Sequence, residues 1–415
     1  MAIVYEKQIN VKPGPFEHFD ITTFFTYILL VGIGLISIYS ATYDAGMSTN
    51  FFKQLTFVGM SIVVLFITMF LPLRWIVAYT EVAYISTLVL LLIVIFFGKE
   101  IAGTKGWIGF GGFGIQPAEL AKLVTLLAVA KFLTSKGADI KKIRDLGTLA
   151  LIVIVPVALI VLQPDVGTAS VFAAILLGVL LWVGFDIFTL FIVIALPVIF
   201  LISLLGTTYY IVSLVIFSAV TILFRKKIYI STLAIVFAVV IGMASPLIFN
   251  NLMPHQKGRI ETFLNPGNDP RGKGYNVIQS TLAVGSGGMT GKGFLQGTQT
   301  QLRYIPEQST DFIFCVPTEE FGFVGGSVVI ILIASLMLRA LRISAESNSK
   351  YLSIVSFGIA SIFFYHSIIN IGMVIGLMPV MGIPLPFLSY GGSALLTNSA
   401  MVGLLLNAYR LRRKN

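Results

Sequence analysis

The chain has 415 residues, of which 57% are hydrophobic and 11% are charged, and its mean hydropathy is +0.94. Charged residues make up about a quarter of ordinary soluble domains, so this composition excludes that class and indicates a polytopic membrane protein. The net charge of +10 comes from cations that fall between apolar runs, which favours a membrane over nucleic acid as the partner. One cysteine excludes an internal disulfide, and three histidines without metal-ligand spacing give no support for a zinc site.

Twelve segments are apolar enough to cross a bilayer, which needs about 20 residues per helix. We expect spans at residues 22–42, 54–72, 80–97, 118–134, 147–163, 167–184, 187–205, 208–224, 228–249, 322–340, 352–371 and 393–410. The first is too long for a cleaved signal peptide and should remain as a span. The predicted fold class is therefore all-α, with one transmembrane domain (22–410) between a cytoplasmic N-terminus (1–21) and a basic cytoplasmic tail (411–415).

Basic residues predict the orientation of these spans. With the N-terminus inside, 18 of the 28 Lys and Arg residues fall on inner segments and nine fall on outer segments. The positive-inside rule weighs short loops, and only three outer cations remain when the long polar interval at 250–321 is left out. We therefore expect both termini in the cytoplasm.

Four polar stretches then fall on the outer face, at residues 98–117, 163–168, 250–321 and 371–392. The longest is uncommon for a loop unless it is functional or disordered, and its interleaved aromatic and aliphatic residues favour a folded cap. Together the four stretches predict a single outer site. The alternative is that Pro and Gly simply end helices at the membrane interface.

Few ionisable residues lie inside or near the spans. Glu119 and Lys122 are three residues apart on one predicted helix face. With Gln116 they either line a polar cavity open to the outside or form a self-satisfied structural pair. Asp165 lies where proline and glycine break the chain between two spans, which favours a role as the cap of the following helix.

The outer interval mixes carboxylates with six cations, a composition that suits a phosphate or diphosphate ligand and a general base. Its acidic residues are Glu261, Asp269, Glu307, Asp311, Glu319 and Glu320. Asp269 lies in the Pro- and Gly-rich segment NPGNDPRGKGY beside Arg271 and Lys273, although an ordinary turn would also explain an Asp there. A solvated charge mosaic is the alternative, and the residues alone do not choose the base.

A glycine-rich segment, GSGGMTGKG at 285–293, superficially matches a nucleotide-binding P-loop. The motif requires Gly where Ser286 stands and Ser or Thr where Gly293 stands, so the match fails. We interpret these glycines as a tight turn.

Several long motifs resemble those of the SEDS family (shape, elongation, division and sporulation), over residues 22–410. They are GIQPAELAKL at 114–123, LQPDVGT at 162–168, FLNPGNDPRGKGYNVIQS at 263–280, GTQTQLRYIPEQSTDFIF at 297–314 and NIGMVIGLMPVMGIPLPFLSYGGSAL at 370–395. The GTQTQL segment and the GMV and PLPF spellings favour the elongation branch over its division paralogue.

The resemblance implies a peptidoglycan glycosyltransferase that polymerises lipid II, with an active site in the outer loop at 250–321. Asp269 matches the family's essential aspartate, which implies a general base that deprotonates the acceptor 4-hydroxyl during an inverting displacement of undecaprenyl diphosphate. Trp107, Glu119, Lys122 and Asp165 match positions that the family needs for its function or for its fold, and Ser389 and Tyr390 match its last outer motif, which implies a structural or cavity-lining role. With the cations Arg271 and Lys273 beside Asp269, these residues are the candidates for substrate binding.

The same resemblance implies a cofactor, partners and a cellular location for the protein. Cations or a divalent metal, Mg²⁺ or Mn²⁺, would stabilise the diphosphate leaving group, with no metal ligands assigned and no organic cofactor. The partners would be a class B penicillin-binding transpeptidase and scaffold proteins of the elongation complex, but not nucleic acid. The location would be the bacterial inner membrane, with the active site on the outer face.

Three departures from the family pattern stand out. Gly106 replaces a common Arg, Ser309 replaces a common His, and relatives have ten spans where twelve are counted here. We therefore expect a two-helix insertion near 187–227, which preserves the sidedness of later segments. The alternatives are a lipid II flippase, motivated by Glu119 and Lys122, a division or sporulation paralogue, and a non-catalytic scaffold, which the four polar stretches disfavour.

Overall fold

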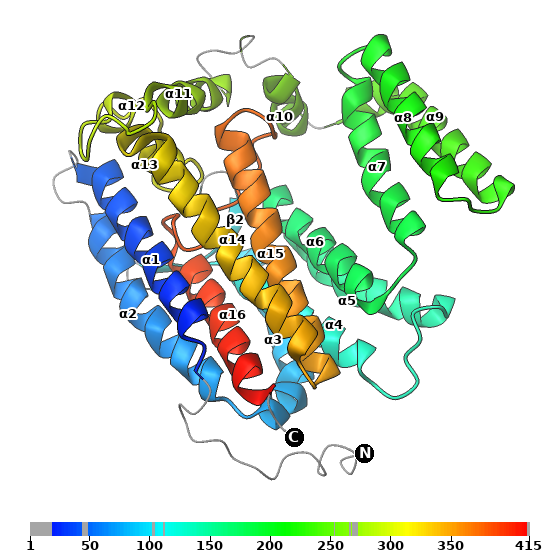
Figure 1. Cartoon of the computed structure of the whole chain (residues 1–415), viewed down its shortest axis with the longest axis horizontal. Coiled ribbons are helices and arrows are strands. Elements are labelled where there is room, and N and C mark those ends of the chain that lie inside the picture. Colours follow the sequence, from blue (N-terminus) through cyan, green and yellow to red (C-terminus); the bar gives the residue numbers. More distant parts are fainter. Residues whose placement is uncertain are drawn as a thin grey trace. The chain divides into compact units, whose positions relative to one another are not determined.

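The computed structural model describes residues 19–43, 49–101, 104–110, 113–252, 254–264, 267 and 273–412. The chain divides into two compact units. Unit 1 combines Met1–Val179 with Asn276–Asn415, and unit 2 is Leu180–Tyr275. The long helices of unit 1 are α1 (Ile21–Thr42), α2 (Thr49–Phe70), α3 (Leu73–Phe97), α4 (Pro117–Leu133), α5 (Ile143–Val161), most of α6 (Val166–Val183), α14 (Gly322–Glu346), α15 (Lys350–Val374) and α16 (Gly392–Leu411) (Figure 1).

Each of the twelve segments expected to span coincides with a helix. Nine of these helices are the long helices of unit 1 given above, and the other three are α7, α8 and α9 of unit 2. Among the described residues, eight helices are long and apolar enough to cross a membrane, and α7 and α8 are shorter apolar helices. The chain is therefore an all-helical, polytopic membrane protein. The described apolar helices number about ten, two fewer than the twelve spans expected.

The two helices that fail this criterion, α4 and α16, are among the most buried of unit 1. α16 packs along α2 and also contacts α4 and α15. Their side chains face protein instead of lipid, so they tolerate residues such as Lys122, Asn398 and Asn407. By contrast α2, α3 and α5 expose many large apolar side chains, as expected of helices that face lipid.

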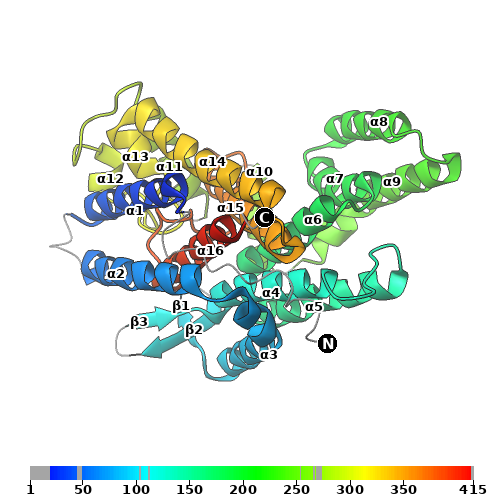
Figure 2. The same cartoon turned by 60° about the horizontal axis from the view of Figure 1, so that its bottom comes forward.

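The segment at 98–117, which we expected to be a polar loop, contains three short strands. They are β1 (Lys99–Ile101), β2 (Thr104–Phe110) and β3 (Phe113–Ile115), paired antiparallel in the order β1-β2-β3. Figure 2 shows them beside α3, which contacts β2, while β3 contacts α16. In GWIGF two glycines are separated by large apolar residues, a pattern from which we expect no strand.

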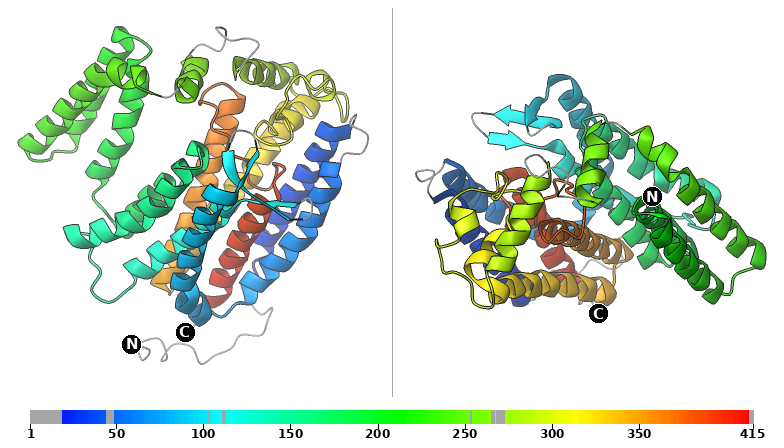
Figure 3. Two further views of the ribbon diagram at one scale, coloured as in Figure 1. Left: turned by 180° about the vertical axis from the view of Figure 1, so that it is seen from behind. Right: turned by 90° about the horizontal axis from the view of Figure 1, so that it is seen from above.

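The expected cap at 250–321 is folded over its described residues. It contains α10 (Pro254–Leu264), α11 (Lys273–Ser286), α12 (Thr298–Gln301) and α13 (Cys315–Glu320). In unit 1, α12 and α13 lie at the same end as the C-terminal end of α1 (Figures 1 and 3). At the opposite end, Asp20 accepts a hydrogen bond from the Thr23 amide at 3.2 Å and pairs with Arg339 of α14 at 2.6 Å. The Asp20–Arg339 pair thus holds the N-terminal end of α1 against α14.

Unit 2 is a small helical unit of its own, formed by α7 (Ile187–Ser203), α8 (Thr207–Leu223), α9 (Ile228–Asn250) and α10. The first three pack against one another around Phe188, Ile199, Phe217, Ala234 and Ala238. Asp186 caps α7 through the Thr189 amide at 3.1 Å and pairs with Lys226 at 2.6 Å.

Close contact between α16 and α2 generates a stability prediction. A Cβ at Gly403 would lie 2.4 Å from the Leu65 carbonyl oxygen and 1.9 Å from Thr68 Oγ1, so Gly403→Ala must push the helices apart. We expect the free energy of unfolding to fall by about 1–3 kcal/mol, measured by thermal unfolding in detergent. Gly59→Ala on α2 is the control, since nothing lies within 4 Å of its Cβ position. Equal stability of the two variants would contradict this packing.

Candidate active site

The four polar stretches predicted to form one site are in contact within unit 1. Gln116 Nε2, from the first stretch, donates to Asp165 Oδ2 of the second at 2.8 Å. A Cβ at Gly167 would lie 2.1 Å from the Met381 carbonyl oxygen, so the second and fourth stretches meet backbone to backbone. The Tyr390 amide donates to the Ser309 carbonyl at 2.8 Å, which joins the fourth stretch to the cap. Their convergence is thus confirmed for the described residues, while their position on the outer face stays a prediction.

Glu119 and Lys122 form a buried ion pair in the middle of unit 1. Lys122 Nζ lies 2.8 Å from Glu119 Oε1, and the residues are only 1% and 2% exposed. α4 places them three residues apart, so their side chains meet on one face. The described contacts show the ion pair, while a cavity or a substrate contact at these two residues stays a prediction. Glu119 Oε2 is also buried and has no hydrogen-bond partner among the described residues.

A third member of this cluster, His366 of α15, was missed in the sequence. Its Nε2 lies 3.2 Å from Lys122 Nζ, and its Nδ1 lies 3.0 Å from the Pro384 carbonyl oxygen. A lone histidine in an apolar helix has no local signal for such a role, because its partners are 244 and 18 residues away in the chain.

Asp165 has the capping role that its sequence predicts. Its Oδ1 accepts a hydrogen bond from the Thr168 amide at 2.9 Å, at the start of α6. Its Oδ2 takes the bond from Gln116, so both carboxylate oxygens are occupied by donors from two different stretches. Trp107 lies half-buried on β2, with its ring against Gly114, where a Cβ would be 3.1 Å from the indole.

Ser389 and Tyr390 tie the connection between α15 and α16 to the cap. Ser389 Oγ donates to the Thr310 carbonyl at 2.7 Å and accepts from the Leu385 amide at 2.8 Å. Tyr390 is half-buried, and burial raises the pKa of its phenol, which therefore stays protonated at neutral pH. Both residues are thus placed by backbone contacts.

The predicted catalytic base is not among the residues that the structure describes. Asp269 and Arg271 lie outside the described residues, and Lys273 is described only as the first residue of α11. Their roles stay predictions from the sequence.

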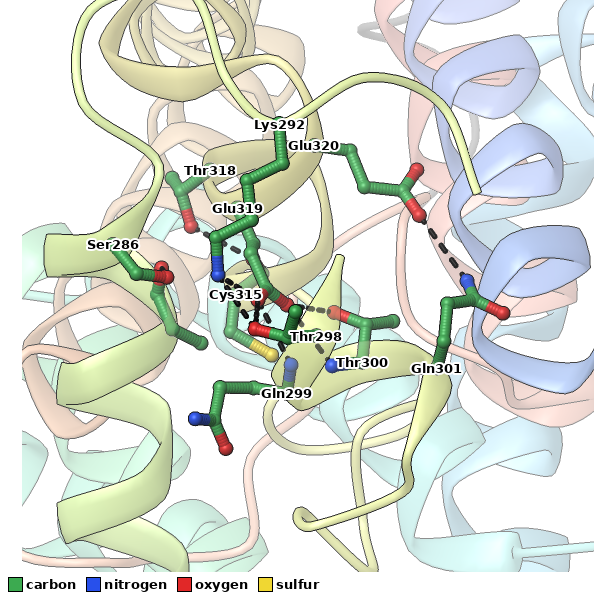
Figure 4. A network of polar contacts seen from close by, with 11 residues as sticks. Ser286, Lys292, Thr298, Gln299, Thr300, Gln301, Cys315, Thr318, Glu319 and Glu320 are labelled. Carbon is green, nitrogen blue, oxygen red and sulfur yellow. Dashed lines mark hydrogen bonds and ion pairs between the residues drawn. The ribbon is translucent and has the colours of Figure 1, made fainter. Parts of the chain in front are cut away.

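The cap contains two carboxylates that are buried, so the solvated-mosaic interpretation is wrong for them. Glu319 is fully buried and accepts hydrogen bonds from Lys292 Nζ at 2.8 Å, from the Gln299 and Thr300 amides at 2.9 Å each, and from the Thr300 hydroxyl at 2.5 Å (Figure 4). Glu320 accepts from Ser40 of α1 and from Gln301 Nε2 at 3.3 Å. Glu319 therefore closes the cap on itself, and Glu320 fastens it to α1.

The glycine-rich segment next to these carboxylates is a tight turn, as expected. Gly291 has φ +82°, and a Cβ there would lie 2.0 Å from the Glu320 carbonyl oxygen. The backbone amides of Lys292 and Gly293 donate to the Glu319 and Glu320 carbonyls at 3.0 and 2.9 Å. The glycines thus allow the loop to pack against α13.

The two glutamates have opposite electrostatic settings. Burial opposes ionisation of Glu319, but hydrogen bonds from Lys292, Thr300 and two backbone amides outweigh it and lower its pKa. At Glu320 burial dominates and raises the pKa, because Ser40 and Gln301 offset it only in part.

No group of three or more His, Cys, Asp or Glu side chains able to hold a metal ion occurs in the described parts of the chain. Mg²⁺ is usually held by one or two carboxylates together with water and phosphate oxygens, so the expected Mg²⁺ or Mn²⁺ stays a prediction.

The buried carboxylates of Glu319 and Glu320 give a prediction of how stability depends on pH. We expect Glu319→Gln to lower the free energy of unfolding by about 2–4 kcal/mol at pH 7, because a buried charge-assisted network loses its acceptor. The pKa of Glu319 is lower in the folded state, so its stabilisation is present at neutral pH and is lost as pH falls below the ordinary glutamate value of about 4.3. The difference from the wild type should therefore shrink in acid, as followed by thermal unfolding.

Glu320→Gln is the matched control, since the raised pKa of Glu320 means that the fold does not favour its charge. We expect this variant to lose less than about 1 kcal/mol. Equal losses for the two variants at pH 7 would contradict the assignment.

Comparisons with known proteins agree with the motifs. A family model described as "Cell cycle protein", which covers FtsW, RodA and SpoVE, matches residues 21–217 and 205–414. The peptidoglycan glycosyltransferase RodA of Treponema pallidum is 35% identical, over 94% of this chain and 97% of the relative. The stage V sporulation protein E of Bacillus subtilis is 34% identical, over 93% of this chain and 95% of the relative.

A solved structure is also similar. It is a chain from a study of how a peptidoglycan synthase complex coordinates polymerization and crosslinking, with a TM-score of 0.71 and 29% identity over 96% of this chain and 99% of that chain. The relatives are bacterial and the described helices include eight apolar spans, so this is a multi-pass protein of the bacterial cytoplasmic membrane. The chain belongs to the SEDS family of peptidoglycan glycosyltransferases.

Proposed function

We propose that the chain polymerises lipid II in the manner of RodA, during cell elongation and the maintenance of cell shape. The observation that carries this proposal is the contact between the four motif-bearing stretches around Asp165 and the cap. The elongation role rests on the GTQTQL, GMV and PLPF segments, because relatives of the elongation and sporulation branches are almost equally similar, at 35% and 34% identity.

In the proposed reaction, the Asp269 carboxylate accepts the proton of the 4-hydroxyl on the acceptor GlcNAc. The oxygen attacks the anomeric carbon of the donor MurNAc, the bond to undecaprenyl diphosphate breaks, and the anomeric centre inverts. Arg271, Lys273 and other outer cations stabilise the diphosphate that leaves. Mg²⁺ or Mn²⁺ remains an optional component, tested by a chelator, and no step depends on it.

A lipid II flippase is the second hypothesis, motivated by polar residues within the spans. Glu119 and Lys122 are buried against each other, which accounts for their presence without a transport path. This observation favours the polymerase.

We extend the proposal to partners and to the extra helices. A class B penicillin-binding transpeptidase would crosslink the new strands, in keeping with the similar chain from a synthase complex, and elongation scaffold proteins would join them.

For the fold, we propose twelve spans with α7 and α8 inserted. The family model matches in two pieces that meet at 205–217, within the region where we place the insertion. Both helices have 17 residues, about 26 Å of helix, which is at the short end for a span.

The catalytic proposal predicts that Asp269→Ala lowers lipid II polymerisation by at least about 100-fold, because general-base catalysis contributes that much or more. Purified protein with its transpeptidase partner is assayed for glycan strands, with and without EDTA. Glu261→Ala, an exposed carboxylate on α10 of the same cap, is the control and should retain the wild-type rate. Polymer of normal length and amount from folded Asp269→Ala protein would refute the role of Asp269.

The topology predicts which engineered cysteines react with an impermeant reagent added outside intact cells. In a Cys315→Ala background, Asn268→Cys and Leu205→Cys should be labelled, while Lys136→Cys and Lys227→Cys should be protected. The native thiol is fully buried, and burial raises the pKa of Cys315, so its removal serves only to exclude background. Protection at position 268 would overturn the outer placement of the cap, and protection at 205 would overturn the inserted pair.

A further inference from the structure

A continuous chain of buried polar contacts runs from α4 through α15 to the outer connection, which we define as residues 375–391. It begins at Glu119, passes through Lys122 and His366, and ends on the carbonyl oxygen of Pro384. Lys122 and His366 are each only 1% exposed, so their side chains depend on protein groups for these contacts. The chain therefore joins three segments that are far apart in the sequence.

The contacts assign the protonation of His366. The Pro384 carbonyl can only accept, so Nδ1, at 3.0 Å, must carry the proton and donate it. Lys122 Nζ can only donate, so Nε2, at 3.2 Å, must be the accepting, unprotonated nitrogen. A cationic imidazole would place a second positive charge beside the buried ammonium of Lys122, with one carboxylate to balance both. His366 is therefore a neutral bridge with one donor and one acceptor.

One turn further along α15, Asn370 also binds the outer connection. Asn370 Nδ2 donates to the carbonyl oxygens of Ile383 and Asp311, both at 2.8 Å. Since residues four apart lie on one helix face, His366 and Asn370 together hold two successive carbonyls of the outer connection. The same connection packs through Met381 against Gly167, and it carries Ser389.

We propose that His366 is a positioning residue of the glycosyltransferase, which fixes the Lys122 ammonium and the outer connection in one arrangement. The proposal rests on the assigned activity and on the prediction that Lys122 and Ser389 belong to the site. Removal of both ring nitrogens leaves a buried N–H of Lys122 and the Pro384 carbonyl without partners. The outer connection is then no longer held to the ion pair, and the groups that it carries shift relative to α4.

Two substitutions separate positioning from simple packing. Glutamine at 366 offers one acceptor oxygen and one donor nitrogen, with a separation close to that of the two ring nitrogens, so it replaces both contacts. Leucine fills similar space and replaces neither. Ser367→Ala is the control on the same helix, because among the described residues this buried hydroxyl bonds only to the Phe363 carbonyl of its own helix, at 2.7 Å.

The experiment measures kcat and KM for lipid II polymerisation by full-length purified protein with its transpeptidase partner, at a temperature where thermal unfolding shows every variant folded. We expect His366→Leu to lower kcat by about 10- to 100-fold, because small displacements of positioned groups are costly. His366→Gln should remain within about threefold of the wild type, and Ser367→Ala should match it.

Wild-type kcat in folded His366→Leu protein would overturn the proposal, as would an equal loss in the glutamine variant. If the leucine variant does not fold, His366→Asn takes its place, since its amide is too short to reach both partners; a wild-type kcat for the folded asparagine variant would likewise overturn the proposal. Inactivity of the wild type itself would instead count against the proposed substrate, so the two failures are distinguishable.

Discussion

The burial of one ion pair constrains much of unit 1. An ammonium and a carboxylate are costly to remove from water, and in a membrane protein they persist only where partners surround them. Glu119 Oε1 and Lys122 Nζ partner each other on α4, among the most buried helices of the unit, and His366 extends the pair to α15. The helices around them must keep one packing arrangement, because a small displacement would leave a buried charge without its partner.

The cap follows the same principle at the end of the helices. Glu319 gathers donors from the loop at 292–300, and Glu320 joins the cap to α1 through Ser40. The outer connection is held between these two networks, by His366 and Asn370 on one side and by Ser309 and Thr310 of the cap on the other. In this way polar contacts connect the helices, the cap and the outer connection of unit 1, which carry the proposed substrate site.

The sequence predicted the positions of the helices well, because long apolar runs between charged segments have few other solutions in a membrane. It also predicted the cap role of Asp165, which depends on neighbouring residues. It missed the strands at 99–115, the burial of Glu319 and the role of His366, since each depends on partners from distant segments. For Asp269 the family motif remains the basis of the prediction, as the residue lies outside the described part of the chain.

The most direct test of this account is a double-mutant cycle between Lys122 and His366, read as the free energy of unfolding of the purified protein in detergent. Lys122→Met, His366→Leu and the double variant are compared with the wild type. If the two side chains form one unit, the cycle should give a coupling energy of about 1 kcal/mol or more. Single-variant effects that add to within about 0.5 kcal/mol would contradict the claim that this contact constrains the fold.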